Sequence, residues 1–278
     1  MVNDLDLNQL SQKLIGIAKE SAIDVGSYLI STFEKGVDSS NRKAGFFDPV
    51  TEADRVAESM IVGHILRSYP DSTIIGEESG HRGNGAVEWY IDPIDGTNNF
   101  IDGIPVFCVS IAAAAYGSLL AAVVYDPIRR EMLSATLEGA FLNGKRIRSS
   151  GNSSDETAVL LTGYPYEGGR ASEADHEFFR ALLRSFRSVR RLGPSALELA
   201  YVACGRADVS FQTNANSWDV AAGMMLVEKA GGRYFAIRST NTDSNIQPWK
   251  VPKFIATCPQ FDLERSCMRE LLQSGIVV

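Results

Sequence analysis

The sequence predicts an α+β fold whose two halves are built differently. Apolar residues recur at helical spacing over residues 7–33, and a second helical pattern covers residues 51–65. From residue 73 to residue 147 the pattern changes to apolar strands separated by turn residues. Beyond residue 155 strand and helix patterns alternate, which is typical of a sheet covered by helices on both faces.

The first half is expected to contain two helices and a largely antiparallel sheet. Thr51-Glu52-Ala53-Asp54 predicts a capping box at the start of the second helix. Residues 106–115 and 119–125 flank a Gly-Ser pair and predict a hairpin, and residues 131–135 predict a further strand. Within residues 141–147, Asn143-Gly144 predicts a tight type I′ hairpin, because both residues tolerate positive φ.

A linker and an alternating pattern characterise the second half. Residues 149–155 are rich in Ser, Gly and Asn and predict a boundary between residues 1–150 and residues 151–278. Strands are expected at 159–162, 207–211, 234–237 and 254–256, and helices at 173–186, 196–203, 219–230 and 261–272.

Composition and charge narrow the class of protein. The 278 residues suffice for one large or two ordinary domains with ample core. A net charge of −7 argues against nucleic acid or an anionic membrane as the main partner. The acidic N-terminus and the lack of a long apolar run predict a cytoplasmic protein without membrane contact. The four scattered cysteines predict free thiols.

The stretch from residue 87 to residue 100 is the most informative in the chain. An apolar strand pattern runs into Asp92-Pro93-Ile94-Asp95-Gly96-Thr97 and is expected to break at the proline, which has no N–H. Two carboxylates on such a turn can face one point, where like charges repel unless a cation separates them. Mg²⁺ takes such oxygen ligands, and the following backbone N–H groups can bind a phosphate beside it. An ordinary turn with a helix-capping Asp92 is the alternative.

Four further segments could converge on the same point. Three of them contain acids: Glu77 after an apolar strand, Asp48 ahead of the second helix, and Asp219 at a helix start. The fourth is the turn Gly193-Pro194-Ser195, whose N–H groups could bind a polyol or anion. Each has a plain alternative as a surface acid, a helix cap or an ordinary helix start. No P-loop or dinucleotide-binding motif is present, so the sequence does not indicate a nucleotide-binding site of either kind.

Taken together, these residues resemble the inositol monophosphatase family of metal-dependent, lithium-sensitive phosphatases. Five segments carry the resemblance, in the family's order and over most of the chain: residues 48–54, 76–79, 89–100, 139–144 and 218–223. The resemblance implies a layered αβαβα sandwich of the inositol monophosphatase and sugar phosphatase type, usually a homodimer. Residues 1–150 would carry most of the metal ligands, and residues 151–278 would carry Asp219 and the substrate side.

The resemblance also implies a site of two or three Mg²⁺ ions. Its ligands would be Glu77, Asp92, the carbonyl of Ile94, Asp95 and Asp219.

Catalytic and substrate-binding residues are implied in the same way. Thr97, hydrogen-bonded to Asp48, would orient and deprotonate a water, with Glu77 as a further catalytic residue. Substrate contacts would come from Gly96, Thr97, Asp95, Gln212, Ser195 and Asp219.

One departure from the family pattern concerns the substrate. Inositol-selective relatives commonly have a glutamate six residues before the Trp-Asp pair, where this chain has Gln212, and Pro194 replaces a small residue. The expected function is hydrolysis of a small phosphomonoester, with inositol monophosphate as the first guess. The alternatives are the same chemistry on histidinol phosphate, fructose 1,6-bisphosphate, a nucleotide 3′-phosphate or NADP, and a non-catalytic regulatory role on the same fold.

Overall fold

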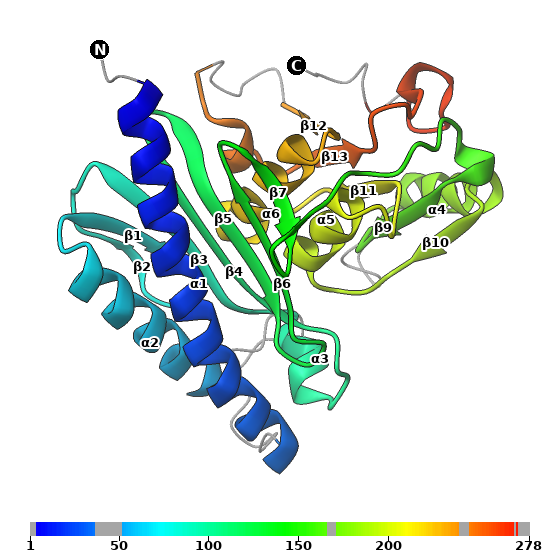
Figure 1. The fold of residues 1–278 in the computed structure, drawn as a ribbon. Helices are drawn as coiled ribbons and strands as arrows, with labels where there is room; N and C mark the ends of the chain where they lie inside the picture. Colours follow the sequence, from blue (N-terminus) through cyan, green and yellow to red (C-terminus); the bar gives the residue numbers. More distant parts are fainter. Residues whose placement is uncertain (1–3, 37–51, 166–170, 239–244, 270, 272–278) are drawn as a thin grey trace.

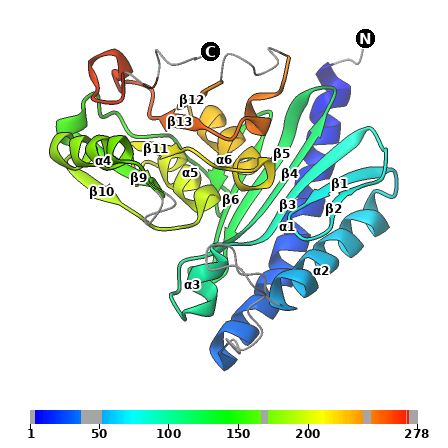
Figure 2. The same ribbon diagram turned by 180° about the vertical axis from the view of Figure 1, so that it is seen from behind.

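The computed structural model has five layers of helix and sheet (Figure 1). It describes residues 4–36, 52–165, 171–238, 245–269 and 271. Helices α1 and α2 cover one face of a first sheet, α5 and α6 lie between this sheet and a second one, and α4 covers the outer face of the second sheet (Figures 1 and 2). The layered αβαβα sandwich expected from the sequence is therefore confirmed.

The first sheet has eight strands in the order β2-β1-β3-β4-β5-β6-β7-β8. Strand β1 is parallel to β3, and the other pairs are antiparallel. The Asn143-Gly144 turn between the last two strands has positive φ at both residues, as a type I′ hairpin requires. The strands are β1 (Ser72–Gly76), β2 (Gly80–Arg82), β3 (Val87–Asp95), β4 (Cys108–Ala115), β5 (Ser118–Asp126), β6 (Glu131–Thr136), β7 (Gly139–Leu142) and β8 (Lys145–Arg146).

Alternating side chains of this sheet fill two separate cores. Trp89, Ile91 and Ile111 pack against α1 (Asp4–Lys35) and α2 (Glu52–Ser68), while Tyr90 and Ala112 face the α5–α6 layer. Because successive side chains of a strand point to opposite faces, a strand that is covered on both faces is apolar throughout. Strand β4 is buried along its whole length for this reason.

The second sheet has the order β10-β9-β11-β13-β12, with β9 parallel to β10 and β11 and antiparallel pairs beyond. Helices α5 and α6 approach closely because Gly223 has no side chain: a Cβ there would lie 2.4 Å from Cβ of Leu199. The elements are β9 (Val159–Thr162), α4 (Glu173–Ser185), β10 (Ser188–Arg190), α5 (Ser195–Ala203), β11 (Val209–Gln212), α6 (Ser217–Lys229), β12 (Arg233–Ala236) and β13 (Phe254–Thr257), with 3-10 turns at Asp155–Thr157, Pro248–Lys250 and Leu263–Arg265.

One expected helix is absent over most of its predicted length, and two short strands were not expected. Residues 261–268 form no α-helix; they contain a 3-10 turn that buries Phe261, Leu263 and Met268 against α4 and the second sheet. The edge strands β2 and β10 were not expected, because three residues leave no clear periodicity.

The predicted boundary near residue 150 lies where the chain passes from the first sheet to the second. One core cluster nevertheless contains residues of both halves, from β3–β7 and from α5 and α6. The division into residues 1–150 and 151–278 stays a prediction. All four cysteines are free, and no helix of the described residues has the length and hydropathy of a membrane span.

Candidate active site

A cavity of about 690 Å³ lies where the end of β3 meets the starts of α5 and α6. It brings together every predicted site residue of the described part of the chain. These residues are Glu77, Asp92, Ile94, Asp95, Gly96, Thr97, Ser195, Gln212 and Asp219. Asp48 and Thr51 lie outside the described residues, so their predicted roles stay predictions.

Pro93 interrupts the pairing of β3 without ending the strand. Asp92 pairs with Ser110 and Asp95 pairs with Cys108, so two residues of β3 oppose one residue of β4. The strand was expected to break at the proline; instead the extra residue forms a bulge, which a missing N–H permits. Bulges re-aim side chains beside active sites, and here both aspartates line the cavity.

Gly96 turns the chain from β3 into the short helix α3 (Thr97–Ile101). Its φ of 97° is left-handed, which favours glycine. A Cβ at this position would lie 2.7 Å from Cγ of Pro194, so a side chain has no room there. The turn that carries the two aspartates is thereby held directly against the Gly193-Pro194-Ser195 turn.

Burial and mutual repulsion dominate the electrostatics of the acidic residues. Burial raises the pKa of Glu77 to about 9, and the charge of Asp219 adds to this. Burial, followed by the charges of Glu77 and Asp95, raises the pKa of Asp92 well above its usual range. Burial also raises the pKa of Asp95 to about 8, against hydrogen bonds that favour its charged form. Without a counter-charge, these carboxyl groups favour their protonated forms at neutral pH.

Asp95 accepts hydrogen bonds from the end of the Gly193-Pro194-Ser195 turn and the start of α5. The N–H groups of Ser195 and Ala196 donate to its two carboxylate oxygens at 3.1 and 2.6 Å. The expectation that this turn offers free donors to a polyol or anion is therefore wrong for these two amides, because a carboxylate of the site already uses them. The side chain of Ser195 still lines the cavity.

Asp219 lies in the first turn of α6. Its Oδ2 accepts the N–H of Asn216 at 2.7 Å, as acids at this helix position commonly do. Ser110 of β4 donates to the carbonyl of Trp218 at 3.0 Å and so fastens this helix start to the first sheet. Asp219 therefore serves helix capping and also faces the cavity.

Thr97 has two acceptors within reach of its hydroxyl. Asp54 Oδ1 lies 3.1 Å from Thr97 Oγ1, and the carbonyl oxygen of Ile94 lies at 2.9 Å. Asp54 belongs to α2 and is buried. The described carboxylate that accepts a hydrogen bond from the Thr97 hydroxyl is therefore Asp54, whereas the sequence analysis named Asp48 for this role. The sequence analysis had explained Asp54 only as part of the capping box at a helix start.

Glu58 orders the loop that follows Glu77. Its two carboxylate oxygens accept the N–H groups of Glu78 and Ser79, both at 2.8 Å. A Cβ on Gly76 would lie 2.5 Å from Glu58 Oε2, so a side chain at this position would displace the carboxylate that orders the loop. Glu58 was missed, although it lies four residues from Asp54 on the buried face of a helix, which is an identifiable signal.

Gln212 is tied at both ends of its amide. Its Oε1 accepts the N–H of Gly163 at 3.1 Å, and its Nε2 donates to Oε2 of Glu198 at 2.9 Å. Glu198 is fully buried in α5, and burial raises its pKa to about 8. It also accepts the N–H of Leu192 at 3.3 Å. The sequence analysis missed Glu198, although it is the one acid in the apolar helix Ser195–Ala203.

The donors of the cavity suit a hard cation. Four carboxylates and a carbonyl supply oxygen ligands of the kind that Mg²⁺ prefers. A cation would offset the burial and the mutual repulsion that raise the pKa values of these carboxylates. As the side chains stand, no three His, Cys, Asp or Glu residues among those described are arranged to hold a metal ion. The donor chemistry therefore fits Mg²⁺, and the side chains would have to turn toward a common point to bind it.

This layered fold with an acidic cavity defines a class of protein, and sequence comparison identifies it. The model of the inositol monophosphatase family matches residues 10–260, so the chain belongs to that family.

The relatives differ in how they are named. A protein of Pseudomonas aeruginosa named Nus factor SuhB is 43% identical over 229 residues, which is 80% of this chain and 84% of the relative. The structure of inositol monophosphatase from Anabaena has a TM-score of 0.78 and 32% identity, covering 95% of this chain and 97% of that one. The Thermotoga maritima inositol monophosphatase (IMPase) has a TM-score of 0.75 and 35% identity, covering 92% and 93%.

Proposed function

We propose that this protein is a Mg²⁺-dependent phosphomonoesterase that acts on a small phosphorylated metabolite, with inositol monophosphate as the first candidate. The observation that carries the proposal is the set of carboxylates around one cavity, beside the Thr97 hydroxyl, which lies within hydrogen-bonding distance of the Asp54 carboxylate. Membership of the inositol monophosphatase family supports it.

The residues that would hold two or three Mg²⁺ ions are those expected from the sequence. They are Glu77, Asp92, the carbonyl of Ile94, Asp95 and Asp219. When bound, Mg²⁺ supplies charge neutralisation for a phosphate and lowers the pKa of a water.

Thr97 is proposed to orient the attacking water. The hydroxyl can accept a hydrogen bond from the water while it donates its own proton to Asp54, 3.1 Å away. This arrangement would direct a lone pair of the water toward phosphorus without a covalent intermediate on the protein. The predicted partnership with Asp48 stays part of the proposal, and Glu77 is proposed to assist the same water.

Substrate recognition is proposed to use both walls of the cavity. The N–H groups of Gly96 and Thr97 would bind phosphate oxygens at the start of α3. Hydroxyl groups of the substrate would meet the side chains of Ser195 and Gln212, with Asp95 and Asp219 close by. Because the amide of Gln212 is bonded at both ends, it would offer only its remaining N–H and lone pair.

A substrate panel tests the choice of substrate. Phosphate release with Mg²⁺ would be measured for inositol 1-phosphate, histidinol phosphate, fructose 1,6-bisphosphate, adenosine 3′,5′-bisphosphate and NADP. We expect the highest kcat/KM for inositol 1-phosphate. A clear preference for another member would retain the chemistry and replace the substrate.

A non-catalytic binding role is the second candidate, because several relatives are named Nus factor SuhB rather than phosphatase. The full set of expected ligands argues for catalysis, since a degenerate member should have lost one. Lack of phosphate release from every compound of the panel, by protein shown to bind Mg²⁺, would favour the binding role.

The expected partners are proposals as well. We propose a homodimer whose main ligand is a small phosphomonoester, without nucleic acid or membrane as the main partner. Sedimentation of the purified protein would test the dimer. The net charge of −7 supports the expectation about nucleic acid, and the names of the relatives do not test it.

A further inference from the structure

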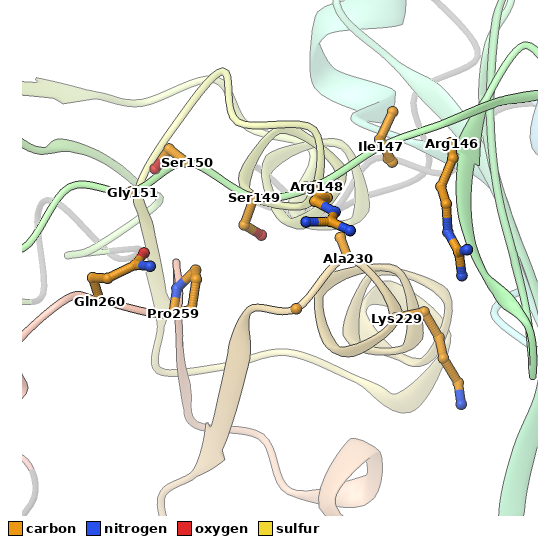
Figure 3. A pocket seen from close by; sticks show the side chains of 11 residues that line it. Arg146, Ile147, Arg148, Ser149, Ser150, Gly151, Lys229, Ala230, Pro259 and Gln260 are labelled. Carbon is orange, nitrogen blue, oxygen red and sulfur yellow. The ribbon is translucent and has the colours of Figure 1, made fainter.

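A second cavity, of about 510 Å³, lies at the C-terminal end of α6 (Figure 3), whereas the acidic site lies at the start of this helix. Its walls come from three segments: residues 146–151, which lead from the first sheet to the second, the end of α6 near Lys229, and residues 259–260 after β13. Helix α6 has 13 residues, so at 1.5 Å per residue about 20 Å of helix lies between the two cavities.

Three cations gather at one side of this cavity. Figure 3 shows the guanidinium group of Arg148 above the end of α6, with Arg146 and Lys229 on the same side. Arg146 donates to the carbonyl of Glu138, and Lys229 donates to the carbonyl of Leu137 at 3.4 Å. These bonds to neutral carbonyls place the cations without neutralising them.

No carboxylate of the described residues is ion-paired with these three cations. Other arginines of the chain have such partners: Arg129 lies 2.7 Å from Asp126, and Arg180 lies 2.7 Å from Glu177. The neighbouring Glu228 interacts electrostatically with Lys229 and offsets part of its charge, whereas Arg146 and Arg148 have no ion pair among the described residues. The group of three cations therefore keeps a net positive field at the cavity, which attracts an anion.

The other walls provide neutral polar and apolar surface. Ser150 and Gln260 lie on the side opposite the cations (Figure 3). Ser149 also lines the cavity, and its Oγ is buried without a hydrogen-bond partner among the described atoms. The nearby acid Asp208 is occupied by Ser150, Asn152 and the N–H of Val159.

The apolar wall residues are Ile147, Ala230 and Pro259. A cavity of this size and mixed lining suits an organic molecule, which uses apolar surface that inorganic phosphate would leave uncovered.

We propose that this cavity binds a small, nucleotide-sized organic phosphate with at least two negative charges. The phosphate groups would lie against Arg146, Arg148 and Lys229, and the organic part would lie toward Ser150 and Gln260. Arginine suits this role because its planar donors match phosphate oxygens in pairs. The proposal does not depend on the catalytic function of the acidic site.

Binding of adenosine 5′-diphosphate, measured by calorimetry on the full chain in EDTA, tests the proposal. Without metal, the acidic site has no cation to hold a phosphate, so the binding that remains and that the double variant weakens reports on the second cavity. We expect adenosine 5′-diphosphate to bind and uncharged adenosine not to bind. The variant Arg146→Ser/Arg148→Ser should raise Kd at least tenfold, whereas Arg180→Ser on α4 should leave Kd unchanged.

Three outcomes would overturn the proposal. One is no heat of binding at millimolar adenosine 5′-diphosphate, and another is an equal Kd for the double variant and the wild type. The third is binding of a single-stranded oligonucleotide or an acidic peptide through the same two arginines when adenosine 5′-diphosphate does not bind, because the occupant would then be a macromolecule. Melting temperatures of the variants equal to that of the wild type would show that the variants are folded, so that a difference in Kd reflects the loss of binding contacts.

Discussion

Glu198 gives the sharpest prediction about stability, because its burial makes the effect of one substitution change sign with pH. The carboxyl group is fully buried, and its pKa is about 8 in the folded protein against 4.5 when unperturbed. The folded state therefore holds a proton that the unfolded state releases between these pH values. The stability associated with the neutral carboxyl is complete below pH 4.5 and is lost as pH rises through 8.

The magnitude follows from the difference between the two pKa values. From 4.5 to about 8 is about 3.5 units, which corresponds to roughly 5 kcal/mol at 1.36 kcal/mol per unit. Glu198→Gln removes this loss, because an amide stays neutral at every pH. The amide accepts only one of the two N–H groups that the carboxylate accepts, which costs about 1 kcal/mol.

Urea unfolding at pH 4, 7 and 9 in EDTA would measure the effect. We expect Glu198→Gln to be less stable than wild type by about 1 kcal/mol at pH 4 and more stable by up to about 4 kcal/mol at pH 9. Glu131→Gln is the matched control, since pairing with Arg206 lowers the pKa of Glu131, and this variant should be destabilised at both pH values. A stability difference for Glu198→Gln that does not vary with pH would refute the reasoning.

Three further predictions concern single contacts of the site and its support. Asp54→Asn should lower kcat by about 100-fold with little change in KM, because the amide cannot take the proton of Thr97; an unchanged kcat would remove Asp54 from the proposed water-orienting pair. Glu58→Ala should leave two amides of the loop after β1 without acceptors and destabilise the protein by about 2 kcal/mol in urea unfolding, and a change within 0.5 kcal/mol would contradict this. Gly223→Ala should destabilise it by about 1–3 kcal/mol through overlap with Leu199, and an unchanged urea midpoint would show that α5 and α6 can separate at no cost.

Local chemistry was sufficient to predict several elements. The hairpin at Asn143-Gly144 depends on two adjacent residues that tolerate positive φ, and the strand Val159–Thr162 was predicted with its observed bounds. The closing helix over 261–272 was predicted from the apolar pattern, whereas the structure forms turns over residues 261–268. There the N–H of Cys267 donates to Asp155, 112 residues earlier, a contact that no local pattern reveals.

The candidate site shows the same division between local and long-range information. The acids on β3 could be identified from the turn that they share. The role of Glu198 could not, because it depends on Gln212 of β11 and on the N–H of Leu192 meeting one helix. The use of the Ser195 amide by Asp95, 100 residues apart, likewise requires the packing of α5 against the first sheet.

Phosphate release from inositol 1-phosphate, with and without Mg²⁺, tests the central claim most directly when wild type and Asp92→Asn are compared. The substitution keeps size and shape and removes the charge of the least exposed of the four proposed carboxylate ligands, which is 3% exposed. The proposal predicts Mg²⁺-dependent release by the wild type and a loss of at least about 100-fold in the variant, which should melt at the same temperature or higher in EDTA. Release by the variant at a rate close to that of the wild type would contradict the assignment of this cavity as a metal-dependent phosphatase site.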